Sequence, residues 1–222
     1  MDIDFSKRDV FETEDGSCSL RLREANEQYH SVHGAINESK HIYIQNGLMN
    51  CHLPIVHVLE LGFGTGLNAI LTFLCHRQQS VCYDAVEAYP LTMCEVEKLN
   101  YPALWNDFPK EIFTMMHTVQ SGNRINLNNH FIFRKWIGKI EDVALPSQYY
   151  NLVYFDMFNP DLQPELWTEE IFAKIYLAMK ENASLLTYCA KGSVKRALKK
   201  VGFQVESLPG PVGKREITRA TK

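Results

Sequence analysis

The sequence Val58-Leu-Glu-Leu-Gly-Phe-Gly-Thr-Gly-Leu-Asn68 decides the fold of this chain. An apolar run, Ile55 to Leu59, precedes an acidic residue, and three glycines at every second position lead into an apolar helix start. Glycine has no Cβ and tolerates positive φ, so such a turn lets the backbone approach a ligand closely. The N-terminus of the following helix adds unpaired N–H groups and the positive end of the helix dipole. A strand, a glycine turn and a helix together predict the first unit of a nucleotide-binding α/β sheet.

The spacing of the glycines indicates which kind of ligand to expect. The pattern is E-x-G-x-G-x-G, with the acid at Glu60 and the glycines at Gly62, Gly64 and Gly66, and not the G-x-G-x-x-G of dinucleotide-binding folds. It points away from a pyrophosphate and towards a nucleoside with an amino-acid tail, S-adenosylmethionine. Glycine-rich turns also occur without any ligand, so the turn alone leaves a purely structural role open.

The rest of the chain continues the same rhythm. Apolar strand-like runs alternate with helical segments from residue 55 onward, which predicts an α/β fold with a mostly parallel seven-stranded sheet and helices on both faces. The expected strands are Ile55–Leu61, Val81–Glu87, Phe131–Ile137, Leu152–Asp156, Ser184–Tyr188, Phe203–Ser207 and Glu216–Arg219. The expected helices are Leu67–His76, Pro90–Asn100, Pro109–Thr118, Thr168–Met179 and Ser193–Val201.

The first 48 residues have a different pattern. Asp15-Gly16 separates two strand-like runs and is a typical hairpin signal. His41–Ile44 fits either a strand or the start of a helix. We therefore expect residues 1–48 to form a β-rich extension that packs on the core, and residues 49–222 to form the main domain.

Length and composition restrict the class of protein. With 222 residues, 45% of them apolar and 22% charged, the chain can bury the core of one sizeable domain. It shows no signal peptide and no apolar run near the ~20 residues of a membrane span, so we expect a soluble cytoplasmic protein without a membrane partner. Six scattered cysteines and eight histidines show neither disulfide nor metal-ligand spacing, so no metal is expected.

Charge is distributed unevenly along the chain. The net charge is −3, but residues 190–222 contain nine basic and two acidic residues and carry +7, whereas the preceding residues carry −10. This asymmetry favours an anionic partner at the C-terminal part of the fold. The alternative is a solvated lysine-rich helix face, because the apolar residues of the same segment are spaced for the core.

Three acidic residues are expected at the carboxyl ends of strands, where open α/β sheets bind ligands. Glu60 ends the first strand. Glu87 ends the second and can accept hydrogen bonds from both hydroxyls of a ribose, although an exposed acid without a role is the alternative. Asp156 ends the fourth strand, between Phe155 and Phe158, and a carboxylate in such apolar surroundings needs a partner. A substrate amine or the ammonium group of the cofactor would serve.

The residues after Asp156 extend this prediction. Asn159-Pro160 follows the acid, as in the acid-x-x-Pro loops that hold amines for methylation. Downstream, Gln163-Pro-Glu-Leu-Trp-Thr168 supplies a turn, an acid and a large aromatic side chain. Trp167 is equally compatible with substrate contact and with core packing.

Six blocks of sequence, spread over nearly the whole chain, carry a family resemblance. They are Tyr29-His-Ser-x-x-Gly-Ala-x-x-Glu-Ser39, Glu60-Leu-Gly-Phe-Gly-Thr-Gly-Leu-Asn68, Glu87-x-Tyr-Pro-Leu-Thr92, Asp156-x-Phe-x-Pro-x-x-x-Pro-Glu-Leu-Trp-Thr168, Gly192-x-Val-Lys-Arg-x-Leu-x-x-x-Gly-Phe203 and Gly213-Lys-Arg-Glu216. Together they are similar to the methyltransferase domain of the bacterial tRNA wobble-uridine modification protein MnmC. The glycine motif that ends in asparagine and the Pro-x-Leu-Trp-Thr box are more specific than a general methyltransferase motif.

The resemblance implies a Rossmann-like class I methyltransferase that uses S-adenosylmethionine. Its substrate would be 5-aminomethyl-(2-thio)uridine at wobble position 34 of tRNA, and its product the 5-methylaminomethyl nucleoside. In the bifunctional relatives an FAD-dependent oxidase follows this domain. The chain has no room for one, so it resembles a stand-alone form that depends on other enzymes for the aminomethyl precursor.

The resemblance also implies roles for individual residues. The cofactor would contact Glu60, Gly62, Gly64, Gly66, Asn68, Glu87 and Asp156. Asp156 would in addition be catalytic, because it would accept hydrogen bonds from the amine and direct the nitrogen lone pair at the methyl group. The tRNA anticodon stem-loop would meet Tyr29, Ser31, Phe158, Pro160, Trp167, Lys191, Lys195, Arg196, Lys214 and Arg215. The five basic residues would face its phosphates.

One position departs from the family pattern, and two other functions stay open. The family has Gly-Asp after the third strand, with the aspartate placed to contact adenine, whereas this chain has Gly138-Lys139; Glu141 or Asp142 could take over that contact. The residues alone also fit a methyltransferase of a small amine or a protein side chain, or a cofactor-binding adaptor without catalysis. A broken glycine turn or a missing acid on the fourth strand would mark the adaptor, and both are intact.

Overall fold

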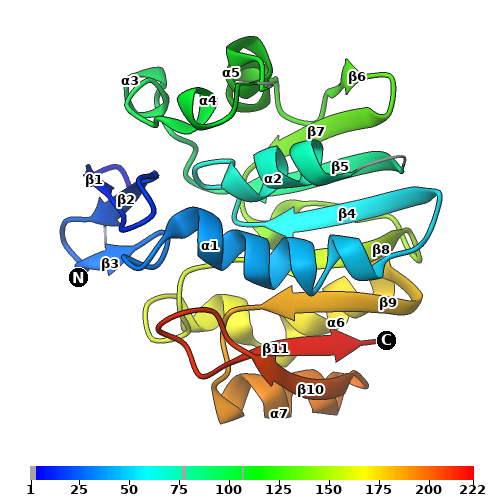
Figure 1. Ribbon diagram of the computed structural model, residues 1–222. Coiled ribbons are helices and arrows are strands. Elements are labelled where there is room, and N and C mark those ends of the chain that lie inside the picture. The colour runs from blue at the N-terminus through cyan, green and yellow to red at the C-terminus, as the bar shows by residue number, and fades with distance from the viewer. Residues whose placement is uncertain (1–3, 77–78, 107) are drawn as a thin grey trace.

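The computed structural model describes residues 4–76, 79–106 and 108–222 and contains one large sheet with helices on both faces (Figure 1). The strand order of this sheet is β10-β11-β9-β8-β4-β5-β7-β6. Its strands are β4 (Ile55–Leu61), β5 (Ser80–Glu87), β6 (Arg124–Asn128), β7 (Phe131–Ile137), β8 (Tyr150–Phe155), β9 (Met179–Thr187), β10 (Gln204–Pro209) and β11 (Glu216–Thr221). The central pairs are parallel and the outer pairs antiparallel. The predicted mostly parallel α/β fold is confirmed.

The number of strands differs from the prediction. Within the described part of the chain the sheet has an eighth strand, β6, which pairs antiparallel with β7 at the sheet edge. Its sequence, Arg-Ile-Asn-Leu-Asn, is mostly polar and exposed, and a bulge interrupts its register. An edge strand of this kind lacks the apolar run that identifies a buried strand in a sequence.

Helices cover the two faces of the sheet and create two cores. The helical elements are α1 (Ala35–Ser39), η1 (Lys40–Gln45), η2 (Leu48–Asn50), α2 (Leu67–Cys75), α3 (Met93–Val96), α4 (Tyr101–Leu104), α5 (Lys110–Thr118), η3 (Ile140–Asp142), η4 (Pro164–Trp167), α6 (Glu169–Ala178) and α7 (Gly192–Val201). Val58 and Leu152 belong to the core that includes α2, whereas Leu59 and Val153 belong to the core that includes α6. Adjacent strand residues point to opposite faces, which explains this division. In the described residues, every helix is too short or too polar to cross a membrane.

The N-terminal residues form a small sheet beyond the carboxyl ends of the parallel strands (Figure 1). Its strands are β1 (Arg8–Glu12), β2 (Cys18–Leu22) and β3 (Glu27–Gln28). The hairpin predicted at Asp15-Gly16 is confirmed, because β1 and β2 pair antiparallel around it. Strand structure ends at Gln28, and Ala35–Gln45 is helical because the apolar residues 42–44 are buried in the main core. The strand alternative for His41–Ile44 was therefore wrong, and the division of the chain at residue 48 stays a prediction.

The helix predicted at Pro90–Asn100 is much shorter in the structure. Thr92 and Glu95 form a capping box that starts α3, and α3 ends after one turn at Val96. A separate short helix, α4, follows with a proline in its first turn. The polar residues between the two helices provide no continuous apolar face that would hold a single long helix against the sheet.

Candidate active site at the carboxyl ends of the parallel strands

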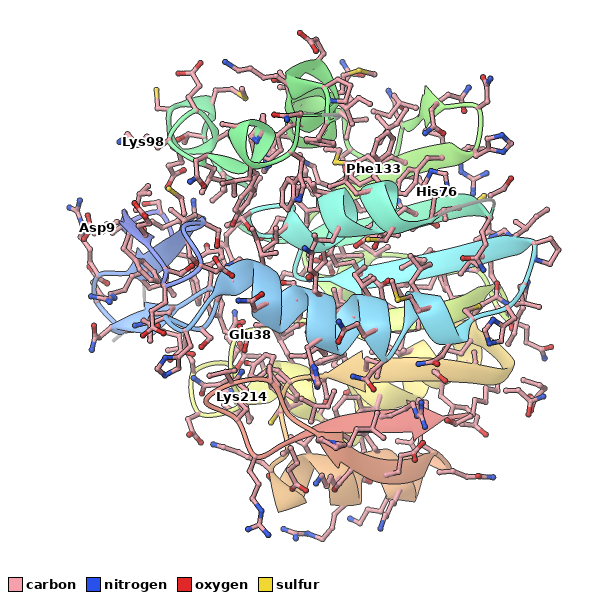
Figure 2. All side chains as sticks on the ribbon, viewed as in Figure 1. Asp9, Glu38, His76, Lys98, Phe133 and Lys214 are labelled. Carbon is pink, nitrogen blue, oxygen red and sulfur yellow. The ribbon has the colours of Figure 1, made fainter. Side chains whose placement is uncertain are left out.

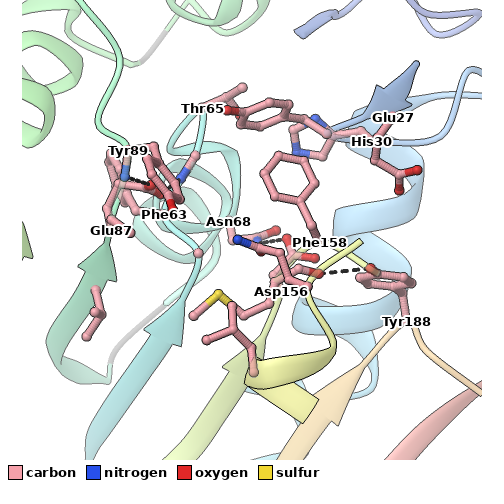
Figure 3. A pocket seen from close by; sticks show the side chains of 18 of the residues that line it. Glu27, His30, Phe63, Thr65, Asn68, Glu87, Tyr89, Asp156, Phe158 and Tyr188 are labelled. Atoms are coloured by element: carbon pink, nitrogen blue, oxygen red, sulfur yellow. Dashed lines mark hydrogen bonds between the residues drawn. The ribbon is translucent and has the colours of Figure 1, made fainter. Parts of the chain in front are cut away.

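A cavity of about 330 Å³ lies at the carboxyl ends of β4, β5 and β8 (Figure 3). One group of lining residues comes from the glycine turn, the end of β5 and the start of η3. A second group comes from the segment 26–31, from α1, and from the loops after β8 and β9 and before β11. The volume and the mixture of apolar and polar walls suit a small-molecule site.

The turn after β4 depends on its glycines. Gly62, Gly64 and Gly66 all have positive φ angles, of 88°, 50° and 78°. A Cβ at Gly62 would lie 2.4 Å from the carbonyl oxygen of Asp156, so only glycine lets this turn pass the end of β8. Gly62 and Gly64 line the cavity, whereas Gly66 is the N-cap residue of α2.

The half-buried His117 and the buried Lys135 pack behind this turn. His117 Nε2 lies 3.2 Å from the carbonyl oxygen of Thr65. Burial lowers the pKa of His117 to about 3, so the neutral ring donates this hydrogen bond. Lys135 donates to the carbonyl oxygens of Met116 and His117 at the end of α5, and its ammonium group lies 4.7 Å from the ring centroid of Phe63. The turn is therefore fixed in the free protein.

Glu87 lies at the end of β5 with both carboxylate oxygens engaged. Oε2 accepts a hydrogen bond of 2.7 Å from the N–H of Gly64, and Oε1 accepts one of 2.7 Å from the N–H of Tyr89. A carboxylate oxygen can accept a second hydrogen bond, so the group keeps acceptor positions for two neighbouring hydroxyls. The structure thus fixes Glu87 at the cavity wall, and its role in ribose binding stays a prediction.

Asp156 follows β8 and lies beside Asn68 in the cavity (Figure 3). Two donors hold its carboxylate. Its Oδ1 accepts a hydrogen bond of 2.8 Å from the hydroxyl of Tyr43, and its Oδ2 accepts one of 2.8 Å from the side-chain amide of Asn68. The same amide nitrogen donates to Oε1 of Glu60 at 3.0 Å. Asn68 therefore links two carboxylates, and the orientation of Asp156 is set from two directions.

Burial sets the acidity of this pair of carboxylates. It raises the pKa of Asp156 to about 6, against the hydrogen bonds from Tyr43 and Asn68, which lower it. Burial also raises the pKa of Glu60 well above its usual value, and Glu60 is fully buried. Glu60 is not among the residues that line the cavity. The structure shows a contact of Glu60 with Asn68, and its direct contact with a cofactor stays a prediction.

Aromatic side chains close the cavity from the N-terminal side. Tyr29 and Ser31 line it together with Phe158, as expected from the sequence. The rings of Tyr29 and Phe158 meet edge to face with centroids 5.0 Å apart, and Phe5 stacks on Tyr89 at 4.2 Å. These contacts join the N-terminal segment to the residues that follow β5 and β8, so the cavity is shielded from water on this side.

Trp167 and Pro160 lie outside the set of lining residues. Trp167 is buried, its ring packs on Phe155 with centroids 4.8 Å apart, and its indole N–H donates to the carbonyl oxygen of Phe158 at 2.8 Å. The structure therefore shows Trp167 packed in the core, where it supports Phe158, and its contact with a substrate stays a prediction.

The basic residues of the C-terminal segment have acidic neighbours. The ion pairs are Lys191–Asp161, Lys195–Glu216, Lys200–Glu169, Lys214–Glu38, Arg219–Glu206 and Lys222–Glu181. Arg196 and Arg215 are exposed and form no ion pair with any described residue. The positive charge seen in the sequence is thus largely neutralised by acids that the fold brings to it. Lys214, expected on the outer surface, lines the cavity instead.

The position that departs from the family pattern also lines the cavity. Gly138, Lys139 and Glu141 are among its wall residues, whereas Asp142 is not. Of the two acids suggested by the sequence, Glu141 is therefore the one placed to contact a ligand at this corner.

Three residues of the site were not predicted. Tyr43 holds Asp156, while Glu38 and Tyr188 line the cavity. Tyr188 ends the fifth predicted strand, so the rule that ligands meet strand carboxyl ends could have identified it. Tyr43 had no such signal, because it contacts a residue 113 positions away in the chain.

Comparison with known proteins gives consistent results. A family model described as S-adenosyl-L-methionine-dependent methyltransferase matches residues 96–222. The tRNA 5-methylaminomethyl-2-thiouridine biosynthesis bifunctional protein MnmC of Pseudoalteromonas atlantica is 30% identical over 85% of this chain and 30% of its own length. The MnmC of Aromatoleum aromaticum is 28% identical over 93% of this chain and 34% of its own. The chain thus spans about a third of the length of these relatives.

Solved structures show the same fold. The crystal structure of MNMC2 from Aquifex aeolicus superposes with a TM-score of 0.79 at 24% identity, over 98% of this chain and 71% of that chain. Spermidine synthase from Thermotoga maritima gives a TM-score of 0.58 at 18% identity, over 97% and 69% of the two chains.

The parallel sheet, the glycine turn and the acids at the strand ends define a Rossmann-like class I methyltransferase. The chain belongs to the S-adenosyl-L-methionine-dependent methyltransferase family, whose model matches more than half of it. It is an enzyme, and its cofactor is S-adenosylmethionine. The resemblance to the methyltransferase domain of MnmC is confirmed.

Proposed function

We propose that this protein methylates the primary amine of 5-aminomethyl-(2-thio)uridine at the wobble position of tRNA, and so makes the 5-methylaminomethyl nucleoside. One observation carries the proposal. The carboxylate of Asp156, held by Tyr43 and Asn68, opens into the same cavity as the glycine turn and Glu87. The similarity to MnmC, whose name specifies 5-methylaminomethyl-2-thiouridine, supports the choice of amine.

The residues of the cavity fit the cofactor. The turn at Gly62 and Gly64 leaves backbone exposed to the cavity, and Glu87 keeps acceptor positions for the ribose hydroxyls. Asn68 and Asp156 would face the methionine part, and Glu141 is the acid available at the adenine corner. When bound, S-adenosylmethionine supplies a methyl group that is attached to a positively charged sulfur. After the transfer, this sulfur is part of a neutral thioether.

The chain's own residues then orient the acceptor amine. An alkylammonium has no free lone pair, so it must lose a proton before it can be methylated. Asp156 would accept hydrogen bonds from the amine, and its pKa of about 6 leaves it mostly ionised at neutral pH. Tyr43 and Asn68 fix the carboxylate, so the nitrogen lone pair is held in one direction. Tyr29 and Phe158 would exclude water from this side of the cavity.

The pairing of the C-terminal lysines favours a second candidate, the methylation of a small amine. If most basic side chains are neutralised by neighbouring acids, the surface attracts RNA less strongly than the sequence suggested. Cytoplasmic location and the use of tRNA stay predictions under either candidate.

One assay separates these functions. The purified protein is incubated with methyl-labelled cofactor and tRNA that carries the aminomethyl precursor, and the nucleosides are analysed by mass spectrometry. We expect labelled 5-methylaminomethyl-uridine. Matched tRNA without the aminomethyl group should stay unlabelled. Label on a polyamine or a peptide, with none on the aminomethyl tRNA, would contradict the proposal.

A further inference from the structure

The wall of the cavity is strongly acidic. Among its described residues the carboxylates are Glu27, Glu38, Glu87, Glu141, Asp156 and Glu165, and the lysines are Lys139 and Lys214. His30 adds no charge at neutral pH, because burial lowers its pKa to about 4. An excess of carboxylates attracts a sulfonium cofactor and an ammonium substrate. It also stabilises the ammonium form of the acceptor, which cannot be methylated.

Lys214 brings a positive charge to the same wall. Its ammonium nitrogen lies 2.6 Å from Oε1 of Glu38 and 4.2 Å from the ring centroid of Tyr188. Figure 2 shows Glu38 on α1 and Lys214 on the loop before β11, on the same side of the molecule. Two segments far apart in the sequence thus meet at this ion pair.

The surrounding backbone holds this pair in place. Oε2 of Glu38 accepts a hydrogen bond of 2.7 Å from the N–H of Ser31. Gly213 has a φ of 83°, and a Cβ there would lie 2.6 Å from the ring of His33. The Lys214 loop therefore packs closely on the N-terminal segment, which limits the positions that the ammonium group can reach.

Both members of the pair act on Asp156. Burial is the main cause of the raised pKa of Asp156, the charge of Glu38 raises this pKa further, and the charge of Lys214 lowers it. The two charges of the ion pair therefore act on Asp156 in opposite directions. Without Lys214, Asp156 and the acceptor amine would also experience the uncompensated charge of Glu38.

We propose that Lys214 is a positioning residue that offsets the charge of Glu38, so that this carboxylate does not add to Asp156 in holding the acceptor amine in its ammonium form. The inference rests on the proposed function. The acceptor ammonium gives one proton to water, and its freed lone pair forms the N–C bond as the C–S bond breaks. The positive charge then resides on the product nitrogen, which releases a second proton.

The titratable groups around Lys214 come from several elements. Those that share the cavity wall with Lys214 include Glu38 of α1, Asp156 after β8, Tyr188 after β9, Glu165 of η4, Glu27 of β3 and His30, while Cys189 feels its charge and the His33–Glu14 pair packs against the loop. Only Glu38 forms an ion pair with Lys214 among the described residues. Removal of either member should therefore act mainly through the charge left on the other.

The pH dependence of kcat tests this inference, since its acidic limb reports groups in the substrate complex. The substrate is an anticodon stem-loop RNA with 5-aminomethyluridine at the wobble position. Lys214→Met should move the acidic limb up by about one pH unit, and Glu38→Gln should move it down by a similar amount. The double variant should return the limb to within roughly 0.3 units of the wild-type protein. Lys214→Arg, which keeps the charge, should leave it in place.

A matched control is Lys222→Met. Lys222 also lies over a tyrosine ring, that of Tyr176 at 4.6 Å, and near a glutamate, Glu181 at 3.8 Å, but it is not a wall residue of the cavity. Its loss should change stability without moving the limb. Suppose that the wild-type protein methylates this RNA and that the acidic limb of its pH profile stays in place in both Lys214→Met and Glu38→Gln. That result would overturn the inference and leave the proposed function standing. Absence of wild-type turnover on this RNA would refute the proposed function, and the inference with it.

Discussion

Asp156 combines a half-buried position with two fixed donors. Tyr43 and Asn68 approach different carboxylate oxygens, so neither oxygen can turn away from the cavity without the loss of a hydrogen bond. The pKa of about 6 arises mainly from burial, and it places the titration of Asp156 near neutral pH. A small change in its surroundings therefore changes its charge.

We expect Asp156→Asn to lower turnover by roughly 100-fold or more, because the amine loses its charged acceptor. Its effect on stability should depend on pH. Folding raises the pKa of Asp156 from 3.8 to about 6, so its stabilising contribution is full below pH 3.8 and is lost as pH rises through 6. As pH rises from 3.8 through 6, the wild-type protein loses this contribution, whereas Asp156→Asn has none to lose. The stability of the variant relative to the wild-type protein should therefore increase over this range, by on the order of 1–3 kcal/mol. Urea unfolding at pH 4.5 and 7.5 measures this, and a pH-independent difference would contradict the assignment.

The glycine turn acts at the scale of an element, because it joins β4 to α2 and passes against the end of β8. At Gly62 two requirements coincide, a positive φ and the absence of a Cβ. Any side chain there pushes the turn away from Asp156. The glycine turn and Asp156 thus keep their spacing through close contact of their backbones.

Gly62→Ala should abolish cofactor binding, with Gly122→Ala as the matched control. Both glycines have a similar φ, 88° and 81°, so both substitutions carry the same backbone strain of roughly 1 kcal/mol. Only at Gly62 would the new Cβ collide with backbone, whereas the nearest atom at Gly122 is 3.8 Å away. Calorimetric titration with S-adenosylmethionine measures the difference. Equal affinities in the two variants would show that the contact with Asp156 is unimportant.

Element prediction succeeded where the sequence pattern repeats locally. The parallel strands and α2 were correct because each buried strand is a continuous apolar run. The polar strand β6 was missed, since its neighbour β7 provides the hydrogen bonds that hold it. The sequence left His41–Ile44 open between a strand and the start of a helix, and the structure is helical there because its apolar side chains pack on strands and helices distant in the sequence.

At the scale of the whole molecule, the fold places acidic residues beside the basic residues of the C-terminal segment. The charge on the surface therefore differs from the charge counted along the sequence. The C-terminal segment carries +7 by count, yet most of its lysines pair with acids from other segments. The exposed Arg196 and Arg215 stay without an ion pair among the described residues. Together with the exposed Lys199, they are the side chains that we propose meet the phosphates of the tRNA substrate.

The double variant Arg196→Ala/Arg215→Ala should weaken tRNA binding and reduce its salt dependence. Each lost phosphate contact lowers the slope of log K against log salt by about 0.7–0.9, so the double variant should lose roughly 1.5. Lys200→Ala is the control, because Lys200 is already paired with Glu169. Fluorescence anisotropy between ~50 and ~200 mM salt gives the slopes. A larger effect of Lys200 would show that ion pairing does not determine which residues bind RNA.

The sequence by itself determined the nucleotide-binding α/β fold, the glycine turn and the acids Glu87 and Asp156. These features depend on short-range chemistry: apolar runs, residues without a Cβ, and acids at strand ends. Only the tertiary structure decided that Tyr43 and Asn68 hold Asp156, that Glu60 is a buried support, and that Lys214 turns into the cavity to meet Glu38. These contacts join residues far apart in the chain, and no local pattern specifies them, because burial and pairing are set by what the completed sheet brings together.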